Sequence, residues 1–293
     1  MAQKIIDLLT QHPTWVGDLF PVAFGKCNDN FTELYAAIAA AIAVGGRNML
    51  INCGSPINQR GFAGGALAAG VYGYDRWKAG AGGCNVAINT TTGVFTHSSG
   101  PLQQIVEAPL LAWGQPLTIS VENPSGSITV SVGGATGTIT SGSGRRGVTL
   151  TPSGSGNMTV QLTATGVTYS RPQLERGSAA TAFDARPVAQ ELALCRRYFE
   201  RVDGTEIAGA TFNAADIMFG CNFSVAKRAA PALATVAYPT WVGNGQTGST
   251  NTIVLAGASI NGFRGDVTGF TGSVVQGLSY NLRGGAFTAD AEL

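Results

Sequence analysis

Charged residues are scarce in this chain. Lysine, arginine, aspartate and glutamate make up 12% of the 293 residues, roughly half the share of about 25% in an average soluble protein. The formal net charge is +1, and no basic run is longer than a pair such as Arg145-Arg146. A neutral surface produces no long-range field that attracts nucleic acid. We therefore expect no nucleic-acid partner.

Residues that bind metals or form disulfide frameworks are also few. The only histidines are His12 and His97, and the five cysteines form no CxxC motif. A structural zinc site needs closely spaced ligand pairs, and a disulfide framework favours an even number of cysteines. We expect buried, reduced thiols and no cofactor.

Long hydrophobic runs are missing. The longest candidate, residues 36–44, is short and mostly alanine, whereas a membrane-spanning helix needs about 20 apolar residues. Residues 1–20 do not show the basic patch and long apolar run of a secretion signal. We expect no membrane insertion, and synthesis in a cytoplasm without export.

The sequence contains neither GxSxG nor GxxxxGK[ST], so two common catalytic or phosphate-binding loops are excluded. Two segments, residues 142–147 and 243–248, match GxGxxG. A dinucleotide-binding loop is followed by a helix, but each of these segments is followed by residues typical of a strand. We interpret both as loops in β structure.

No pair of carboxylates stands out as catalytic. Glycosidases need two carboxylates at a defined separation, and the spacing of the acidic residues singles out none. Asp75 lies beside Arg76 and Trp77, where an ion pair next to an aromatic ring is the simplest interpretation. His97 lies among turn residues, and we expect a structural or solvated loop histidine. We expect that the protein is not an enzyme.

Glycine, by contrast, is abundant: 41 of the 293 residues, about twice the usual share of about 7%. Glycine-rich turns separate short segments in which apolar and polar residues alternate, a pattern that indicates antiparallel strands. The predicted strands include residues 117–121, 127–132, 148–151, 159–164, 252–255, 273–275 and 278–282. We predict a mainly β fold with a short N-terminal helix, a jelly-roll sandwich, a linking helix and a smaller C-terminal β domain.

Two helices are predicted. The first begins at Asn28 or Asp29, after an irregular lead-in over residues 1–28. Its apolar positions recur at spacings of three and four, which is typical of a seam between helices. These positions are Phe31, Leu34, Ile38 and Ala41. The seam either forms a trimer interface or packs on its own domain. The second helix is predicted at 189–202.

These elements divide the chain into three parts. Residues 1–46 form an N-terminal segment with the short trimerising helix, residues 47–186 form the jelly roll, and residues 187–293 form the linking helix with a distal β domain. The division follows the end of the first helix at Gly45-Gly46 and the start of the second helix after Pro187.

The distal part holds the predicted binding residues. Exposed aromatic side chains stack on sugars, side-chain amides hydrogen-bond to hydroxyl groups, and loops on rigid scaffolds often carry recognition. Trp241 precedes a long polar segment, residues 242–249. We predict receptor contacts at Tyr238, Trp241, Asn244 and Gln246, whereas Trp77 and Trp113 are expected in the core.

Three groups of segments together carry a resemblance to a known family. The N-terminal one is residues 25–35 (GKCNDNFTELY). The next resembles the opening of the jelly roll and comprises residues 48–52 (NMLIN), 57–61 (INQRG) and 74–77 (YDRW). The last resembles its ending and comprises residues 173–178 (QLERGS), 182–187 (AFDARP) and 191–199 (ELALCRRYF). Together these segments resemble bacteriophage tail fibre or receptor-binding proteins with a carbohydrate-binding-module-like jelly roll, over roughly residues 25–202.

The resemblance implies a virion protein of the tail, usually a homotrimer, that acts in host attachment without a cofactor or a fixed catalytic set. Its expected partners are other tail proteins, through the N-terminal segment, and a host-surface polysaccharide, pilus or protein. Three sites on one axis would raise avidity without covalent chemistry. The alternatives are a structural connector in the tail or baseplate and, less favoured, a depolymerase of surface polysaccharide.

Overall fold

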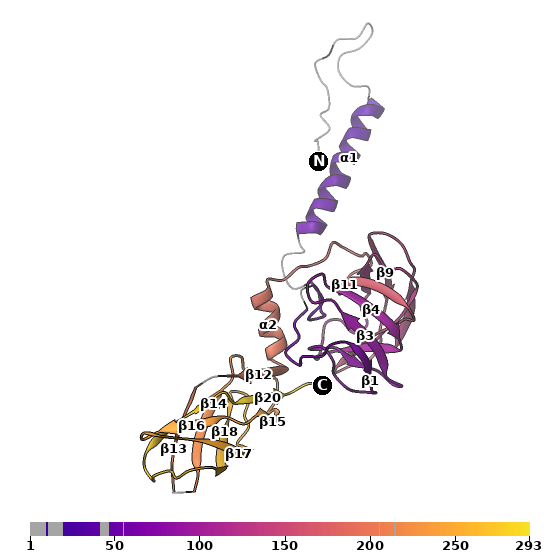
Figure 1. Ribbon diagram of the computed structural model, residues 1–293. Coiled ribbons are helices and arrows are strands. Elements are labelled where there is room, and N and C mark those ends of the chain that lie inside the picture. Colours follow the sequence, from indigo (N-terminus) through magenta and orange to yellow (C-terminus); the bar gives the residue numbers. More distant parts are fainter. Residues whose placement is uncertain (1–9, 11–19, 42–46, 55, 205, 214) are drawn as a thin grey trace. The chain divides into compact units, whose positions relative to one another are not determined.

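The computed structural model describes residue 10 and residues 20–41, 47–54, 56–204, 206–213 and 215–293, without the side chains of residues 35–41. The chain forms two compact units, residues 1–47 and residues 48–293. Figure 1 shows a helix in the first unit, and a sandwich, a second helix and further sheets in the second. The predicted mainly β class with a short N-terminal helix is confirmed.

Helix α1 spans Phe20–Ala41 and begins eight residues before Asn28, its predicted start. Pro21 lies in the first turn, where the N–H groups have no partner within the helix and proline is tolerated. The predicted irregular lead-in is therefore wrong for residues 20–28, and residues 1–9 and 11–19 lie outside the described residues. Among the helices that the structure describes, none has the length and apolar character needed to cross a membrane.

Eleven short strands form the sandwich. They are β1 (Gly65–Leu67), β2 (Lys78–Ala79), β3 (Cys84–Ile88), β4 (Val94–Ser99), β5 (Pro101–Val106), β6 (Leu117–Glu122), β7 (Ile128–Val132), β8 (Ala135–Ile139), β9 (Arg145–Leu150), β10 (Met158–Thr163) and β11 (Val167–Arg176). One antiparallel sheet has the order β1-β3-β4-β11-β6-β9, and the other has the order β2-β5-β10-β7-β8.

The alternation in β7 shows why these segments form a sandwich. Ile128, Val130 and Val132 are buried, while Thr129 between them is exposed. Successive side chains of a strand point to opposite faces, so one face enters the core and the other meets solvent. Trp77 lies fully within this core and donates its indole N–H to the carbonyl of Asn52 at 2.9 Å. The predicted core position of Trp77 is confirmed.

Helix α2 (Val188–Arg196) is shorter than predicted, because β12 (Phe199–Asp203) follows it. The prediction of a helix over residues 189–202 is therefore wrong in its second half. In β12 each residue from Phe199 to Asp203 pairs with one in β20 (Ala286–Asp290). The helical spacing of the apolar residues was a local signal, and pairing with a strand some 80 residues away overrides it.

The C-terminal strands form a three-stranded sheet and a closed barrel. The sheet has the order β12-β20-β15, with β15 at Ala232–Ala237. The barrel closes in the order β13-β14-β18-β17-β16-β19. Its strands are β13 (Ile207–Ala210), β14 (Ile217–Asn222), β16 (Thr240–Gly243), β17 (Gln246–Ala256), β18 (Gly262–Phe270) and β19 (Ser279–Arg283).

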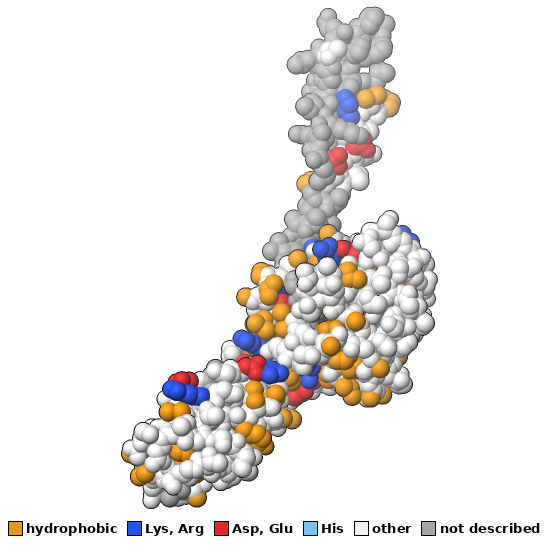
Figure 2. Space-filling model, in the orientation of Figure 1, with side chains coloured by type: hydrophobic (Ala, Val, Ile, Leu, Met, Phe, Trp, Pro, Cys, Tyr) orange, Lys and Arg blue, Asp and Glu red, His pale blue; other side chains and the backbone are white. Residues whose placement is uncertain are grey.

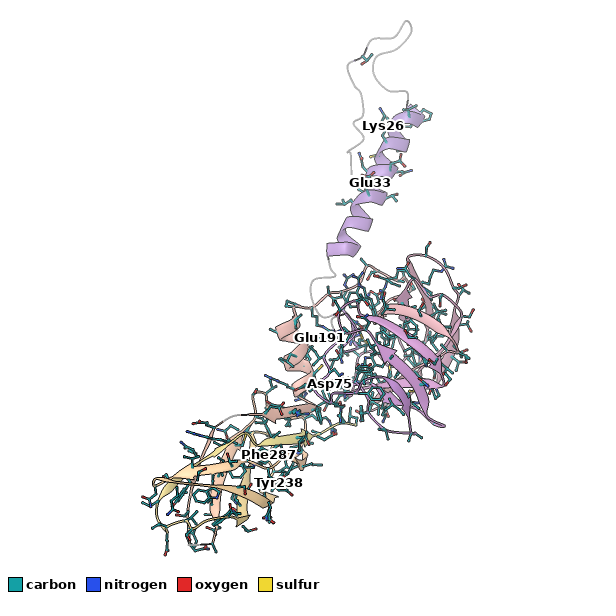
Figure 3. The ribbon with its side chains drawn as sticks, in the orientation of Figure 1. Lys26, Glu33, Asp75, Glu191, Tyr238 and Phe287 are labelled. Atoms are coloured by element: carbon teal, nitrogen blue, oxygen red, sulfur yellow. The ribbon has the colours of Figure 1, made fainter. Side chains whose placement is uncertain are left out.

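These C-terminal sheets enclose a second apolar core, distinct from that of the sandwich. Trp241, Phe287 and Tyr280 lie in it, whereas Tyr238 is 53% exposed. Figure 3 labels Phe287 and Tyr238. The indole ring of Trp241 meets the ring of Tyr280 edge-on, with centroids 5.4 Å apart. This edge-to-face arrangement is one that aromatic pairs favour.

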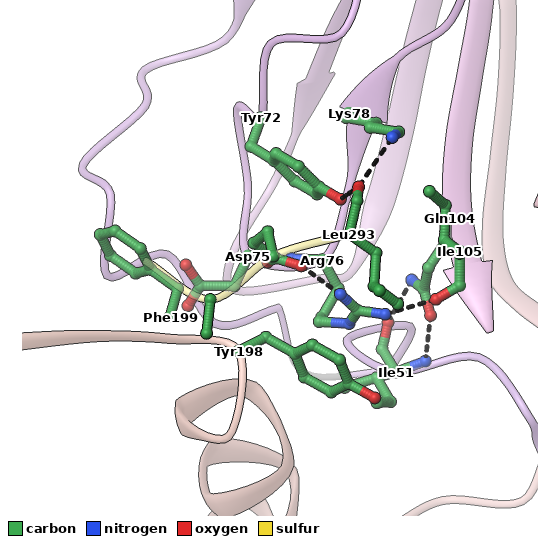
Figure 4. Close-up of polar contacts among 12 residues, drawn as sticks. Ile51, Tyr72, Asp75, Arg76, Lys78, Gln104, Ile105, Tyr198, Phe199 and Leu293 are labelled. Carbon is green, nitrogen blue, oxygen red and sulfur yellow. Dashed lines mark hydrogen bonds and ion pairs between the residues drawn. The ribbon is translucent and has the colours of Figure 1, made fainter. Parts of the chain in front are cut away.

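Sandwich and C-terminal sheets belong to one compact unit because the last residues return to the sandwich. The carboxylate of Glu292 pairs with the guanidinium of Arg76, and the carbonyl of Leu293 accepts hydrogen bonds from Tyr72 Oη at 2.7 Å and Lys78 Nζ at 2.9 Å. Figure 4 shows these side chains converging on the end of the chain. The expected boundary at residue 187 thus separates two cores but not two compact units.

Candidate binding site

Three connections lie at one end of the barrel. Neighbouring barrel strands are antiparallel, so the segments that follow β13, β16 and β18 meet at the same end. We call this surface the loop end and define it as residues 211–213, 215–216, 244–245 and 271–278. The strands of the three-stranded sheet join the barrel at its opposite end. Loops carried by a closed barrel have a rigid support, which suits recognition.

Hydrogen bonds fuse two of these connections into one surface. The backbone N–H of Thr211 donates to the carbonyl of Leu278 at 3.1 Å, and its hydroxyl donates to the carbonyl of Val275 at 2.6 Å. The N–H of Gly277 donates to the carbonyl of Thr211 at 3.1 Å. Thr211 is itself buried, so these bonds are shielded from water.

The third connection is a tight hairpin turn. Asn244 and Gly245 have φ values of 50° and 71°, and Gly243 pairs with Gln246 across the turn. Asn-Gly with both residues at positive φ is the favoured two-residue hairpin connection. The hairpin is tied to the neighbouring loop, because the N–H of Ser249 donates to the Thr271 hydroxyl at 3.0 Å.

Asp216 is the one charged residue of the loop end as defined. Its carboxylate accepts hydrogen bonds from the N–H of Phe212 at 3.2 Å and of Asn213 at 3.3 Å, and from the Asn213 amide at 2.8 Å. The charge is thus used to hold the loop conformation, and the outer face offers apolar and uncharged polar groups. Charged side chains are also sparse on the face of the molecule in Figure 2.

Three apolar side chains project from this surface. Phe212 is 71% exposed, Val275 is 48% exposed and Leu278 is 38% exposed. Val274, next to Val275, is turned into the core instead, and the backbone N–H of Val275 donates to the Tyr280 hydroxyl at 2.8 Å. Because hydrogen bonds already hold these loops in place, their apolar side chains can bury surface against a partner with little further loss of conformational entropy.

The structure separates the predicted receptor contacts. Asn244 and Gln246 are exposed, at or beside the hairpin turn. Tyr238 precedes the other end of β16, so it is not part of the loop end. Trp241 is fully buried and donates its indole N–H to the carbonyl of Thr271 at 3.2 Å, so its predicted contact with a receptor is wrong. The predicted long polar loop over residues 242–249 is wrong too, because most of it is strand.

Sequence reasoning missed the three exposed apolar residues. Residues 273–275 were predicted as a strand, but they belong to the connection between β18 and β19. In this loop the side chain of Val274 points into the core and that of Val275 points to solvent, which imitates the alternation of a strand. Phe212 sits beside the turn residue Asn213, and this was the signal that could have indicated an exposed aromatic side chain.

The predicted trimer seam lies on α1. Phe31 and Leu34 are 54% and 52% exposed, and Ile38 and Ala41 belong to the helix with side chains outside the described residues. The longer helix extends the apolar repeat toward its N-terminus at the same alternating spacings of four and three. The extended series is Phe20, Phe24, Cys27, Phe31, Leu34, Ile38 and Ala41. Phe20 and Phe24 are 74% and 55% exposed.

Buried ionisable groups in the sandwich are engaged in structural bonds. His97 was predicted in a loop but lies in strand β4. Its Nε2 lies 2.7 Å from the Gly100 carbonyl oxygen, and its Nδ1 lies 3.1 Å from the Tyr169 hydroxyl. Burial lowers the pKa of His97. Burial raises the pKa of Asp75 to about 6. Its carboxylate accepts two bonds from Gln59 and lies 3.9 Å from Arg60 Nε. The predicted partner of Asp75, Arg76, pairs with Glu292 instead.

Among the described residues, no cluster of three or more His, Cys, Asp or Glu side chains is arranged to hold a metal ion. Comparison of the chain with family models, curated proteins and solved structures finds no match. The interpretation of the loop end therefore depends on its chemistry and geometry.

Proposed function

We propose that the protein is a virion component of a bacteriophage tail fibre or tail tip that attaches to the host surface by multivalent, non-catalytic binding. The observation that carries this proposal is the loop end, where Phe212, Val275 and Leu278 project from hydrogen-bonded loops with almost no charge. Such a surface suits contact by apolar burial and amide hydrogen bonds, with Asn244 and Gln246 beside it.

Self-association through α1 would supply the multivalency. In a heptad, Phe24, Phe31 and Ile38 take the a positions, and the d positions are Phe20, Cys27, Leu34 and Ala41. The flanking e and g positions contain no charged residue. They are Pro21, Ala23, Asn28, Asn30, Tyr35 and Ala37. Four of the six, all but the two asparagines, are apolar or aromatic and widen the apolar face beyond a strict a/d stripe, which suits a bundle of more than two helices.

The charged residues of α1 lie away from this face. Lys26 and Glu33 (Figure 3) occupy c positions, opposite the seam. Three heptads of apolar seam bury more surface than the predicted seam, which covers less than two heptads. Most of the stability of a helix in a protein comes from packing of such an apolar face. We therefore propose a parallel homotrimer that carries three loop ends on one axis and attaches to other tail proteins through its N-terminal segment.

Adhesion to bacterial cells tests the attachment function. Labelled full-length protein is titrated onto a panel of bacterial strains, and the Phe212→Ser/Val275→Ser double variant is compared on each strain that binds. Loss of two apolar contacts should weaken apparent affinity by roughly tenfold or more. Val71→Ser, which replaces a 46% exposed residue of the sandwich, is the matched control and should bind normally. Equal binding by the double variant and the control would contradict a receptor contact at the loop end.

Point variants are preferable to a shortened chain. Residues 290–293 bond to the sandwich, so removal of the C-terminal sheets would also expose Arg76 and its neighbours.

A second measurement, binding of the protein to purified tails, addresses the connector function. Binding to tails with no adhesion to any strain would overturn the attachment proposal in favour of a connector.

One observation favours that second function. Leu110 and Leu111, in the connection between β5 and β6, are 77% and 73% exposed beside Trp113. Neighbouring exposed leucines on a sandwich loop suit a stable contact with another protein. If the protein is a connector, Leu110→Ser/Leu111→Ser should weaken its binding to purified tails, while the loop-end variant should not.

A further inference from the structure

Arg196, at the C-terminal end of α2, holds a positive charge without a partner. Its Nε is buried and has no hydrogen-bond acceptor, and its guanidinium makes no ion pair within the described residues. A buried donor without an acceptor is unfavourable. The nearby cation Lys227 pairs with Glu200 and donates to the Arg196 carbonyl, so Glu200 is already engaged and does not neutralise Arg196.

This guanidinium lines a hollow of about 350 Å³ formed by the loop at residues 58–61, α2 and β12. The volume lies near the lower end of the range of small-ligand pockets. Arg201 and Asp203 stand at its border as an ion pair, with Nε and Oδ1 2.7 Å apart. Since that pair is neutral, Arg196 leaves the hollow with one net positive charge.

Acceptors for hydroxyl groups are also present. The Gln59 amide nitrogen donates to Asp75 at 3.1 Å and to the Phe199 carbonyl at 2.8 Å, which fixes the amide orientation. Gln59 Oε1 therefore remains as an acceptor without a described partner. Asp203 uses one carboxylate oxygen for Arg201, and its side chain is 55% exposed. Leu192 contributes apolar surface to the same hollow.

We infer that this hollow binds a sugar residue that carries a carboxylate, as in an acidic surface polysaccharide. The carboxylate would accept hydrogen bonds from Arg196, hydroxyl groups would donate to Gln59 Oε1 and Asp203, and a C–H face of the ring would pack on Leu192. A single negative charge on the ligand matches the single net positive charge. The carboxylate of Asp203 disfavours a dianion such as phosphate, because like charges repel in a partly desolvated site.

This site extends the proposed function by naming a chemical class of host glycan, and its role in attachment rests on that proposal. The binding chemistry itself does not, since it can be measured without cells. The hollow is also separate from the loop end, so the two surfaces can be altered independently.

Ligand-detected NMR on the full-length protein tests the inference with three probes: D-galacturonate, D-galactose and acetate. Galacturonate should bind at least about tenfold more tightly than either of the others, because it alone has both the carboxylate and the hydroxyl groups. In Arg196→Gln, galacturonate binding should fall to the level of galactose. Arg176→Gln removes the same charge from an exposed sandwich arginine and should change nothing.

Folding is checked by the free energy of unfolding, which Arg196→Gln should leave unchanged or raise, since the guanidinium makes no bond to the part of the chain that the structure describes. Equal binding of galacturonate and galactose by the wild type would overturn the inference. So would equal binding of acetate, which indicates a simple anion site, or full binding by Arg196→Gln. Galacturonate binding without adhesion to cells would count against the attachment function alone.

Discussion

The guanidinium of Arg76 and the carboxylate of Glu292 form a buried ion pair between the sandwich and the last residues of the chain, with side-chain exposures of 1% and 3%. Arg76 also lies over the ring of Tyr198, 3.5 Å from its centroid, and donates its backbone N–H to Glu292 at 3.1 Å. One arginine thus joins the sandwich, the residue before β12 and the C-terminal segment (Figure 4).

Removal of one partner of this pair should destabilise the protein strongly. Glu292→Gln leaves the Arg76 charge buried without an ion-pair partner, and we expect a loss of about 3–5 kcal/mol in the free energy of unfolding. Arg76→Met should cost less, because Glu292 keeps a longer contact with Arg60 Nη2 at 3.5 Å. Urea denaturation measures it. The Arg76→Met/Glu292→Gln double variant should lose less than the sum of the single losses. As a control, Arg264→Gln breaks the ion pair between Asp266 and Arg264, whose side chain is 59% exposed. This change should lower the free energy of unfolding by at most about 1 kcal/mol.

Asp75 should make stability depend on pH in an unusual direction. Burial raises its pKa from 3.8 to about 6 in the folded protein, so the folded state binds a proton between these values and the unfolded state does not. The contribution of Asp75 to the free energy of unfolding should therefore increase as the pH falls through 6, and level off near pH 4. The gain is at most about 3 kcal/mol. Most carboxylates have lowered folded pKa values and act oppositely.

The difference between wild type and Asp75→Asn isolates this effect. Urea denaturation at several pH values between 7 and 4 should show the wild type gaining stability relative to the variant, because asparagine does not titrate. A constant difference across this range would show that Asp75 is not protonated in the folded protein as the pH falls.

Two neighbouring glycines of the β16–β17 hairpin should respond differently to alanine. A Cβ at Gly248 would lie 2.2 Å from the Thr271 carbonyl oxygen and 2.5 Å from Trp241 Nε1, so backbone and core would both have to move. We expect Gly248→Ala to cost several kcal/mol, roughly as much as a severe overpacking. At Gly245 the space is open and only φ of +71° is unfavourable. Gly245→Ala should cost about 1–2 kcal/mol, and thermal unfolding ranks the two. Equal losses would mean that Trp241 does not pack against Gly248.

Cys27 offers a direct test of the parallel trimer. In a parallel, in-register bundle the three Cys27 thiols face one axis, since Cys27 occupies a d position of α1. Diamide should oxidise two of the three thiols to one disulfide, while diamide itself is reduced to the hydrazine. Non-reducing electrophoresis should then show covalent dimer at no more than about two thirds of the protein, and no covalent trimer.

Matched cysteine variants define the outcome. Cys27→Ser should abolish the covalent dimer, whereas Cys221→Ser, which removes the other partly exposed thiol, should not. Light scattering on the unoxidised protein should give three times the mass of the 30.0 kDa chain. A monomeric mass, or cross-linking that persists in Cys27→Ser, would refute assembly through α1.

Local signals determined much of this fold. The alternation at 127–132 and 159–164 became β7 and β10, and the Asn244-Gly245 pair became a hairpin turn. Both GxGxxG segments are followed by strand residues and not by a helix, as predicted, although much of each segment is itself strand and not loop. Strand alternation and turn chemistry are properties of a few adjacent residues, so they can be identified in a single sequence.

Tertiary structure decided the rest. Residues 199–203 have helical spacing but form a strand because β20 pairs with them, and Trp241 is a core residue because the barrel closes around it. The loop end exists only because that closure brings Thr211, Val275 and the hairpin together. The sequence alone specified the strand and turn types and the apolar repeat of α1. Which side chains meet and which stay exposed depended on pairing between distant segments, whose energy no local pattern contains.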